Sequence, residues 1–191
     1  MGKTFLRFLV AVAALAGSGS AQAEQYAALL SRLLAQGQAQ NMFQPTVEAR
    51  LQALLNAYRV AHGKPPLGDD AALKSAARGH AADMALHNFM GHTASSGHDF
   101  DSRMHALRPG VMVLPAMGEN AAMRSAGGAA DVLAQQLFQA WLNSPPHLHT
   151  LMSREYLRVA TGVSVFGGKA YADEIFVGPE VHTNMNIGGG N

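Results

Sequence analysis

Apolar residues recur with helical spacing in three stretches of the chain. Side chains three and four positions apart lie on one face of a helix, and such a face packs on a core. This spacing predicts helices at residues 46–61, about 70–88 and about 131–141. Asp69 or Asp70 is expected to cap the second helix, because a short acidic side chain accepts bonds from the first free N–H groups. Asp99–Leu107 predicts a shorter capped helix.

Two strand-like runs follow in the C-terminal part. Val159–Phe166 and Lys169–Val177 flank Gly167-Gly168, and two glycines between such runs predict a β-hairpin. The apolar run Val111–Leu114 is a candidate for a further extended segment. Helices followed by a hairpin predict an α+β fold, with helices around a small antiparallel sheet.

Residues 141–147, Trp-Leu-Asn-Ser-Pro-Pro-His, mark a junction between two helices. Ser144 is expected to accept bonds as the N-cap, and Pro145 suits the first helical position. His147 then lies in the first turn of the new helix, where the prolines hold the backbone in place. This makes His147 a candidate site residue.

Glycines precede two further candidates. Gly91 permits a positive φ, so it is expected to end the second helix sharply and to project His92 from a fixed backbone. Glu119 lies between Gly118 and Asn120, which suggests a turn that directs the carboxylate. His80, inside the second helix, is interpreted as a core or flank histidine.

The first 23 residues have the features of a signal peptide. Lys3 and Arg7 precede an apolar run at residues 8–16, and Ala21-Gln22-Ala23 has the small-residue pattern of a cleavage site. The apolar run is too short to span a bilayer. We therefore expect cleavage after Ala23 and an extracytoplasmic product, periplasmic or secreted, without a transmembrane segment.

The rest of the chain divides into three parts. Residues 24–44 are expected to be an accessory segment, with a short helix at Tyr26–Leu34, that packs loosely or frays. Residues 45–180 form the main domain, which is long enough for a hydrophobic core. Residues 181–191 are expected to be a disordered tail.

Charge and cysteine content narrow the function classes. Without Lys3 and Arg7, 12 of the 14 basic residues remain against 13 acidic ones, a formal charge of −1, which argues against nucleic acid as a partner. The chain has no cysteine, so any metal must bind to histidines and carboxylates. The polar cluster at residues 98–105 has no recognisable ligand spacing, and we interpret it as a capping cluster.

Several short motifs follow one another between Val47 and Val177. They are Leu55-Asn56-Ala57-Tyr58-Arg59 with Pro66-Leu67, Ala81–Ala85 with Asn88-Phe89 and Gly91-His92, Gly118-Glu119-Asn120, Trp141–His147 and Gly162–Val165. In this order they resemble the bacterial branch of the CAP superfamily, the cysteine-rich secretory, antigen 5 and pathogenesis-related proteins that share the SCP domain. The resemblance implies an α-β-α sandwich.

The same resemblance implies a cleft lined by histidines and acids. Carried over by motif, the histidines are His92 and His147 and one acid is Glu119, with Asn120 beside it. The second acid of the family falls close to Ser144. Two imidazoles and a carboxylate are suitable ligands for Zn²⁺ or another divalent ion, so the resemblance implies a metal as an optional cofactor.

The favoured function is a binding module. Its cleft would hold a small molecule, a lipid or an envelope component, with or without a divalent metal. Methionine suits adaptable apolar surfaces, although ordinary core packing is the alternative reading of the same residues. The candidates for such an apolar rim are Met90, Met112, Met117 and Met123.

Two other functions stay open. In a hydrolase, Glu119 would act as base on a water held by His92 and His147 or by a metal. Ser144 is better explained as a helix cap than as a nucleophile. In an envelope structural or interaction protein, the cleft would be a scaffold and residues 24–44 would dock a partner.

Overall fold

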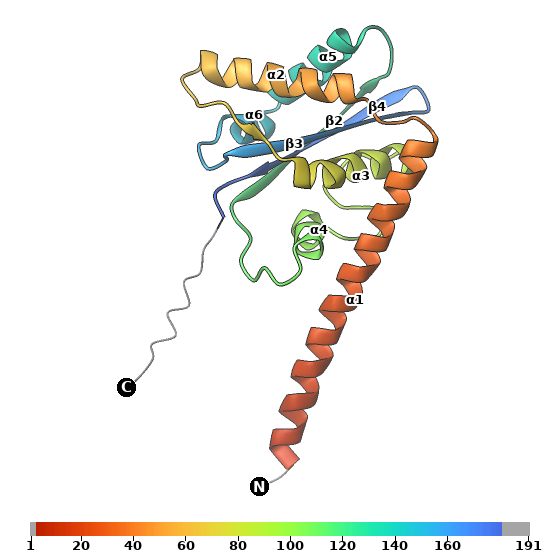
Figure 1. Ribbon diagram of the computed structural model, residues 1–191, viewed down its shortest axis with the longest axis vertical. Helices are drawn as coiled ribbons and strands as arrows, with labels where there is room; N and C mark the ends of the chain where they lie inside the picture. Colours follow the sequence, from red (N-terminus) through yellow and green to blue (C-terminus); the bar gives the residue numbers. More distant parts are fainter. Residues whose placement is uncertain (1–2, 181–191) are drawn as a thin grey trace.

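The protein is a small sheet enclosed between layers of helices (Figure 1). The computed structural model describes the backbone of residues 3–180 and the side chains from Ala21 onward. Its elements, in chain order, are α1 (Lys3–Ala39), α2 (Pro45–Ala61), β1 (Gly68–Asp69), α3 (Ala71–His87), α4 (Phe100–Leu107), β2 (Met117–Ser125), α5 (Ala130–Leu142), α6 (Pro145–Met152), β3 (Arg158–Phe166) and β4 (Lys169–Val177).

The sheet has the strand order β1-β3-β4-β2. β3 and β4 form the predicted hairpin, and its turn residues Gly167 and Gly168 have φ values of 56° and 75°, which glycine adopts without strain. β2 pairs antiparallel with β4, and Glu119 lies opposite Ile175. The two-residue β1 pairs with the start of β3. β2 is therefore an edge strand, and it carries the Gly-Glu-Asn motif.

Each face of the sheet packs on its own set of helices. α2, α5 and α6 cover one face, where Leu51, Leu137 and Trp141 belong to the largest apolar cluster. α3 and α4 cover the other face, and Figure 1 shows these two sets on opposite sides of the strands. α3 approaches β3 so closely that a Cβ added at Gly162 would lie 2.3 Å from the backbone of Ala77. The α-β-α sandwich is confirmed.

Two strand predictions need correction. Val111–Leu114 is not a strand, and the strand in this region is β2, which contains the Gly-Glu-Asn motif that was expected to be a turn. The middle of β2 is buried on both faces, so it lacks the apolar–polar alternation of a half-exposed strand. Its polar residues Glu119 and Asn120 made it look like a loop. Pairing with β4 decides its conformation.

The N-terminal segment packs more tightly than predicted. α1 is one continuous helix to Ala39, and it buries Tyr26, Leu30 and Leu33 against α3 and α4. Leu30 fits over Gly79, where an added Cβ would lie 2.1 Å from its Cδ1. Phe43 then forms an isolated β-bridge with Ser164. The expectation of loose packing is wrong, because these apolar residues form a stripe with helical spacing.

Other sequence predictions concern the ends of the chain. The proposed tail at 181–191 lies outside the described residues. Cleavage after Ala23 stays a prediction. Within the part of the chain that the structure describes, no helix combines the length and the apolar character needed to cross a bilayer.

Candidate functional site

The loop that carries His92 leaves α3 at Asn88. Asn88 has the left-handed conformation, with φ 52° and ψ 49°, and ends the helix. Gly91 was predicted to make this turn, but it does not have a positive φ. Asparagine tolerates the left-handed region better than other residues with a Cβ, which explains why the turn occurs at Asn88.

Two buried side chains of α3 hold this loop in place. Nε2 of His80 contacts the carbonyl oxygen of Gly91 at 2.8 Å. The carboxylate of Asp83 accepts from the backbone N–H of Ser95 at 2.8 Å and from its hydroxyl at 2.5 Å. Burial lowers the pKa of His80, so its ring is neutral and Nε2 carries the proton that it donates. His92 therefore lies on a loop anchored on both sides.

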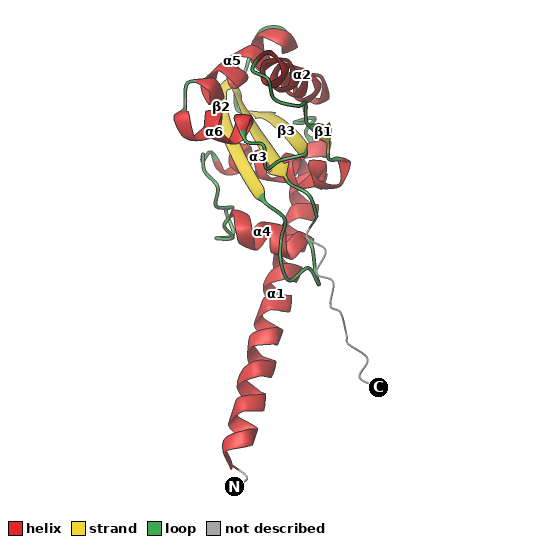
Figure 2. Ribbon diagram, turned by 90° about the vertical axis from the view of Figure 1, so that its left-hand side faces the viewer, coloured by secondary structure: helices red, strands yellow, loops and turns green. Residues whose placement is uncertain are grey.

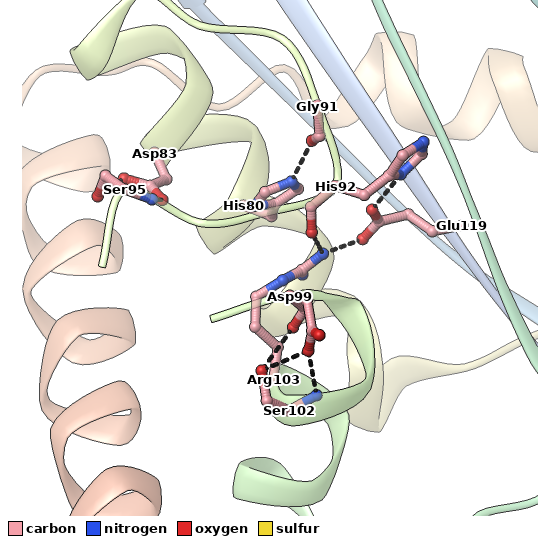
Figure 3. A network of polar contacts seen from close by, with 9 residues as sticks. All are labelled: His80, Asp83, Gly91, His92, Ser95, Asp99, Ser102, Arg103 and Glu119. Carbon is pink, nitrogen blue, oxygen red and sulfur yellow. Dashed lines mark hydrogen bonds and ion pairs between the residues drawn. The ribbon is translucent and has the colours of Figure 1, made fainter. Parts of the chain in front are cut away.

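Glu119 connects His92 to a buried arginine. Oε1 of Glu119 accepts from Nδ1 of His92 at 2.7 Å, and Oε2 accepts from Nη2 of Arg103 on α4 (Figure 3). The same Nη2 donates to the backbone oxygen of His92 at 3.1 Å. The side chain of Glu119 is 2% exposed, Arg103 is fully buried, and the His92 side chain is 53% exposed. Both carboxylate oxygens of Glu119 are thus occupied from within the protein.

The charges of this network support one another. Burial alone would raise the pKa of Glu119, but the hydrogen bond from His92 and the charge of Arg103 lower it below its usual value. The hydrogen bond to Glu119 raises the pKa of His92, although burial opposes this. Glu119 is therefore an ionised acceptor that orients His92, with Nδ1 held inward while the side chain of His92 stays about half exposed.

His147 approaches from the other side, in the first turn of α6. Nδ2 of Asn120 donates to its backbone oxygen at 3.1 Å, which ties α6 to β2. Burial lowers the pKa of His147, and the charge of the nearby His92 lowers it further. No hydrogen bond joins His147 to His92 or Glu119 within the described residues. The two imidazoles are neighbours with opposite pKa shifts.

Ser144 has the backbone position of an N-cap but not the predicted bond. It precedes Pro145 at the start of α6, yet its side chain accepts no capping hydrogen bond. Pro146, at the second helical position, has no N–H to donate, which removes one of the two usual partners of an N-cap side chain. Asp70 and Asp99, in contrast, cap α3 and α4 with their side chains, as the sequence indicated.

The arrangement differs from a three-ligand metal site. Among the described residues, no group of three or more histidine and acidic side chains is placed to hold a metal ion. Both oxygens of Glu119 are taken, so its natural role toward any ion is to orient His92. The residues that fit as direct ligands are Nε2 of His92 and the ring of His147.

Methionines are divided between the surface and the core. Met112 is 91% exposed and is followed by the exposed Val113, so the loop before β2 displays an apolar tip. Met90 is also exposed. Met117 and Met123 instead pack against apolar clusters, as the alternative interpretation expected.

The site also contains three supporting residues that the sequence analysis did not assign to it. They are Arg103, His80 and Asp83. Arg103 shares the buried face of α4 with Met104, and a charged residue on an apolar helix face signals a buried partner. His80 and Asp83 lie on the buried face of α3 in the same way. The sequence alone indicates that these residues have buried partners, but it does not identify those partners.

Known proteins share the sequence pattern and the fold of this chain. The model of the cysteine-rich secretory protein family (CAP) matches residues 52–178. This chain belongs to that family. A membrane protein of Bacillus subtilis, YlbC, is 31% identical over 120 residues, which cover 63% of this chain and 32% of that protein. The chain thus spans about a third of that relative.

Solved structures show the same CAP fold. An extracellular SCP-domain protein from Bacillus anthracis aligns with a TM-score of 0.57 and 24% identity, over 71% of this chain and 41% of that one. An outer surface protein from Borrelia burgdorferi also aligns at 0.57, with 17% identity over 68% and 90% of the chains. A cysteine-rich secretory protein from Staphylococcus aureus aligns at 0.51, with 18% identity over 71% and 39%. These structures confirm the fold, and the family model confirms the family recognised from the motifs.

Proposed function

We propose that this CAP protein is an extracytoplasmic binding module whose ligand contacts His92 and His147. The observation that carries the proposal is the complete engagement of Glu119 by His92 and Arg103. A carboxylate held by a buried guanidinium is a poor proton acceptor, because protonation would leave Arg103 without its partner. The arrangement is suited to presenting Nε2 of His92 in a fixed direction.

The chemistry of the cleft favours a ligand with both polar and apolar parts. His92 and His147 supply hydrogen-bonding nitrogens, and Met90 together with the loop tip at Met112 supplies exposed apolar surface. Small molecules, lipids and envelope components have this combination. An extracytoplasmic location is supported by the neighbours described as extracellular and outer-surface proteins, and by the signal-peptide features of residues 1–23.

A divalent ion is an optional part of this proposal. Nε2 of His92 and the ring of His147 would bind it, and Glu119 would support His92 through Nδ1. Such an ion would fix a polar ligand or a water. Binding requires neutral imidazoles, so it would weaken as the pH falls below about 6.

The test is a ligand screen in which the two histidines report binding. Imidazole NMR signals of His92 and His147 would be followed while Zn²⁺, a long-chain fatty acid, a phospholipid and soluble peptidoglycan fragments are added separately. At least one probe should shift both signals and should lose its affinity in His92→Ala/His147→Ala. His62→Ala removes an exposed histidine elsewhere and should bind like the parent. A folded parent that responds to none of the probes would contradict the proposal.

Hydrolysis is the second candidate, and the opposite pKa shifts of the two histidines favour it. A His92 whose pKa is raised by the hydrogen bond to Glu119, beside a His147 whose pKa is lowered by burial, is an acid–base pair of the kind that enzymes build by giving two groups different surroundings. In this version His147 is the base and Glu119 only orients His92. Turnover of an ester or peptide substrate that is lost in His147→Ala would favour the enzyme, whereas binding without turnover would favour the module.

A further inference from the structure

The His92 network is closed from behind by a helix outside the segment that matches the family. The family match begins at residue 52, whereas α1 ends at Ala39. α1 packs against both α3 and α4, the two helices that supply His80 and Arg103. In Figure 3 it runs along the side of the network opposite to Glu119. A segment that the sequence suggested was accessory thus forms a wall of the candidate site.

Tyr26 is the residue of α1 that we place in this wall. It is 2% exposed, and its ring lies 5.4 Å from the ring of His98, on the loop that leads into α4. Burial raises the pKa of its hydroxyl, while the charge of Arg103 opposes the rise and the charges of Asp173 and Glu119 add to it. Tyr26 therefore shares one buried region with the charged pair Arg103 and Glu119 and with the acid Asp173.

We call this region the rear chamber and define it by Tyr26, His80, Arg103, Glu119 and Asp173. It holds strongly polar atoms that have no hydrogen-bond partner within the described residues, namely Nε and Nη1 of Arg103, Nδ1 of His80 and both oxygens of Asp173. One guanidinium faces two carboxylates here, of which Glu119 makes the direct contact. Such a cluster depends on exclusion of bulk water, because water screens the Arg103–Glu119 attraction and competes for its hydrogen bonds.

We propose that Tyr26 is a positioning residue of the candidate site, whose ring seals the rear chamber and thereby keeps Arg103 and Glu119 aligned on His92. The packing of α1 on α3 and α4 buries Tyr26, and in this role its ring keeps water from Arg103. Arg103 holds Oε2 of Glu119, and Oε1 of Glu119 holds Nδ1 of His92. Without the ring, the guanidinium becomes hydrated and Glu119 loses its anchor. The cleft nitrogen of His92 then loses its fixed direction.

The proposal rests on His92 being a ligand-binding residue, but its first readout needs no ligand. At a pH above the raised pKa of His92, where its ring is neutral, the ¹⁵N shifts of that ring report which nitrogen carries the proton. These shifts would be recorded for the protein exported from the full-length chain, with the His92 signals assigned by their loss in His92→Ala. The parent should show His92 protonated on Nδ1, facing Glu119.

Four variants separate positioning from packing. Tyr26→Phe keeps the ring and should retain the Nδ1–H form. Tyr26→Ala should shift more than half of the His92 population to the Nε2–H form. Tyr26→Val also removes the ring, with a smaller loss of apolar volume, and should shift the His92 population in the same way. It replaces Tyr26→Ala if that variant does not fold. Leu33→Ala truncates a buried neighbour on the same helix face and should leave the His92 shifts unchanged.

The second readout is the affinity for Zn²⁺ alone, measured by calorimetry. Groups that orient a metal-binding histidine change the affinity by about tenfold or more, so Tyr26→Ala should weaken Zn²⁺ binding by about that factor and Tyr26→Phe should not. If the parent binds no Zn²⁺ but the tautomer shift occurs, the positioning role stands and the metal part of the proposed function fails. An unchanged tautomer in folded Tyr26→Ala or Tyr26→Val overturns the positioning role, as does an equal change in Leu33→Ala.

Discussion

The two faces of the sheet bury very different chemistry. The face under α2, α5 and α6 holds the apolar core around Trp141, with Glu174 and Glu48 as buried acids and Arg59 as a buried base. The face under α1, α3 and α4 buries Arg103, Glu119 and Asp173 within a few contacts of His92. Arg59 is held on the first face by the backbone oxygens of Leu151 and Ser153, whereas Arg103 on the second face depends on a carboxylate. The His92 network therefore lies on one side of the sheet and the largest apolar cluster on the other.

β4 shows this contrast at two successive residues. Asp173 and Glu174 point to opposite faces because side chains alternate along a strand. Burial raises the pKa of both well above their ordinary values, and Asp173 also feels the charge of Glu119. On the apolar face Glu174 has only the hydroxyl of Thr161 at 3.4 Å. Glu174 therefore keeps its proton where Glu119, which faces Arg103, does not.

Removal of Arg103 tests the polar face most strongly. Arg103→Leu should lower the free energy of unfolding by about 3–5 kcal/mol, because it leaves the Glu119 carboxylate buried without its guanidinium. Urea denaturation at neutral pH measures the loss. Adding Glu119→Gln to the same chain removes the stranded charge and should recover a large part of the stability. A single variant as stable as the parent would show that Glu119 is not held as an ion by Arg103.

Truncation of a side chain on the apolar face should lower the stability without changing the His92 network. Leu137→Ala removes a fully buried side chain of α5 and should cost about 3 kcal/mol through lost transfer energy and the cavity left behind. The His92 tautomer and any Zn²⁺ affinity should stay those of the parent, since α5 does not contribute to the network. Urea denaturation and histidine NMR on the same sample check both statements. A His92 change as large as that in Arg103→Leu would mean that the two faces are not separable.

The ionisation of Glu174, on the apolar face, should make the stability of the protein depend on pH. Its pKa is raised from 4.5 to about 8, so the folded state holds a proton that the unfolded chain releases above about 4.5. This contribution to stability is present at low pH and is lost as the pH rises from about 4.5 to 8. Glu174→Gln cannot ionise and should be more stable than the parent by about 2 kcal/mol near pH 8, with little difference near pH 4. Thermal unfolding across this range would settle the point, and parallel curves for the two proteins would contradict it.

The smallest expected effect is at Ser144. An N-cap serine usually contributes about 1 kcal/mol, but this side chain makes no capping bond. Ser144→Ala should therefore change the free energy of unfolding by less than about 0.5 kcal/mol. Asp70→Ala is the matched contrast, because Asp70 caps α3 and also pairs with Arg158 at 3.0 Å. A loss at Ser144 equal to that at Asp70 would reveal a contact that the capping geometry does not show.

Sequence reasoning found the elements whose residues interact locally. The helices at Pro45–Ala61 and Ala71–His87 and the hairpin at Gly167-Gly168 follow from periodicity and turn chemistry, which act within a few residues. β2 was missed because only its long-range pairing with β4 makes it a strand. The turn at Asn88 was assigned to Gly91 for a related reason, since both residues tolerate unusual backbone angles and the packing of the loop selected one of them.

For the candidate site, the sequence by itself nominated three residues: His92, Glu119 and His147 were chosen from motifs and the turns expected around them. Only the tertiary structure decided what Glu119 does there, because Arg103 reaches it from another helix and occupies its second oxygen. It also decided that α1 is part of the wall, through Tyr26 and Leu30. Motifs record residue types at fixed spacing, whereas the partner of a buried charge depends on which distant segments the fold brings together.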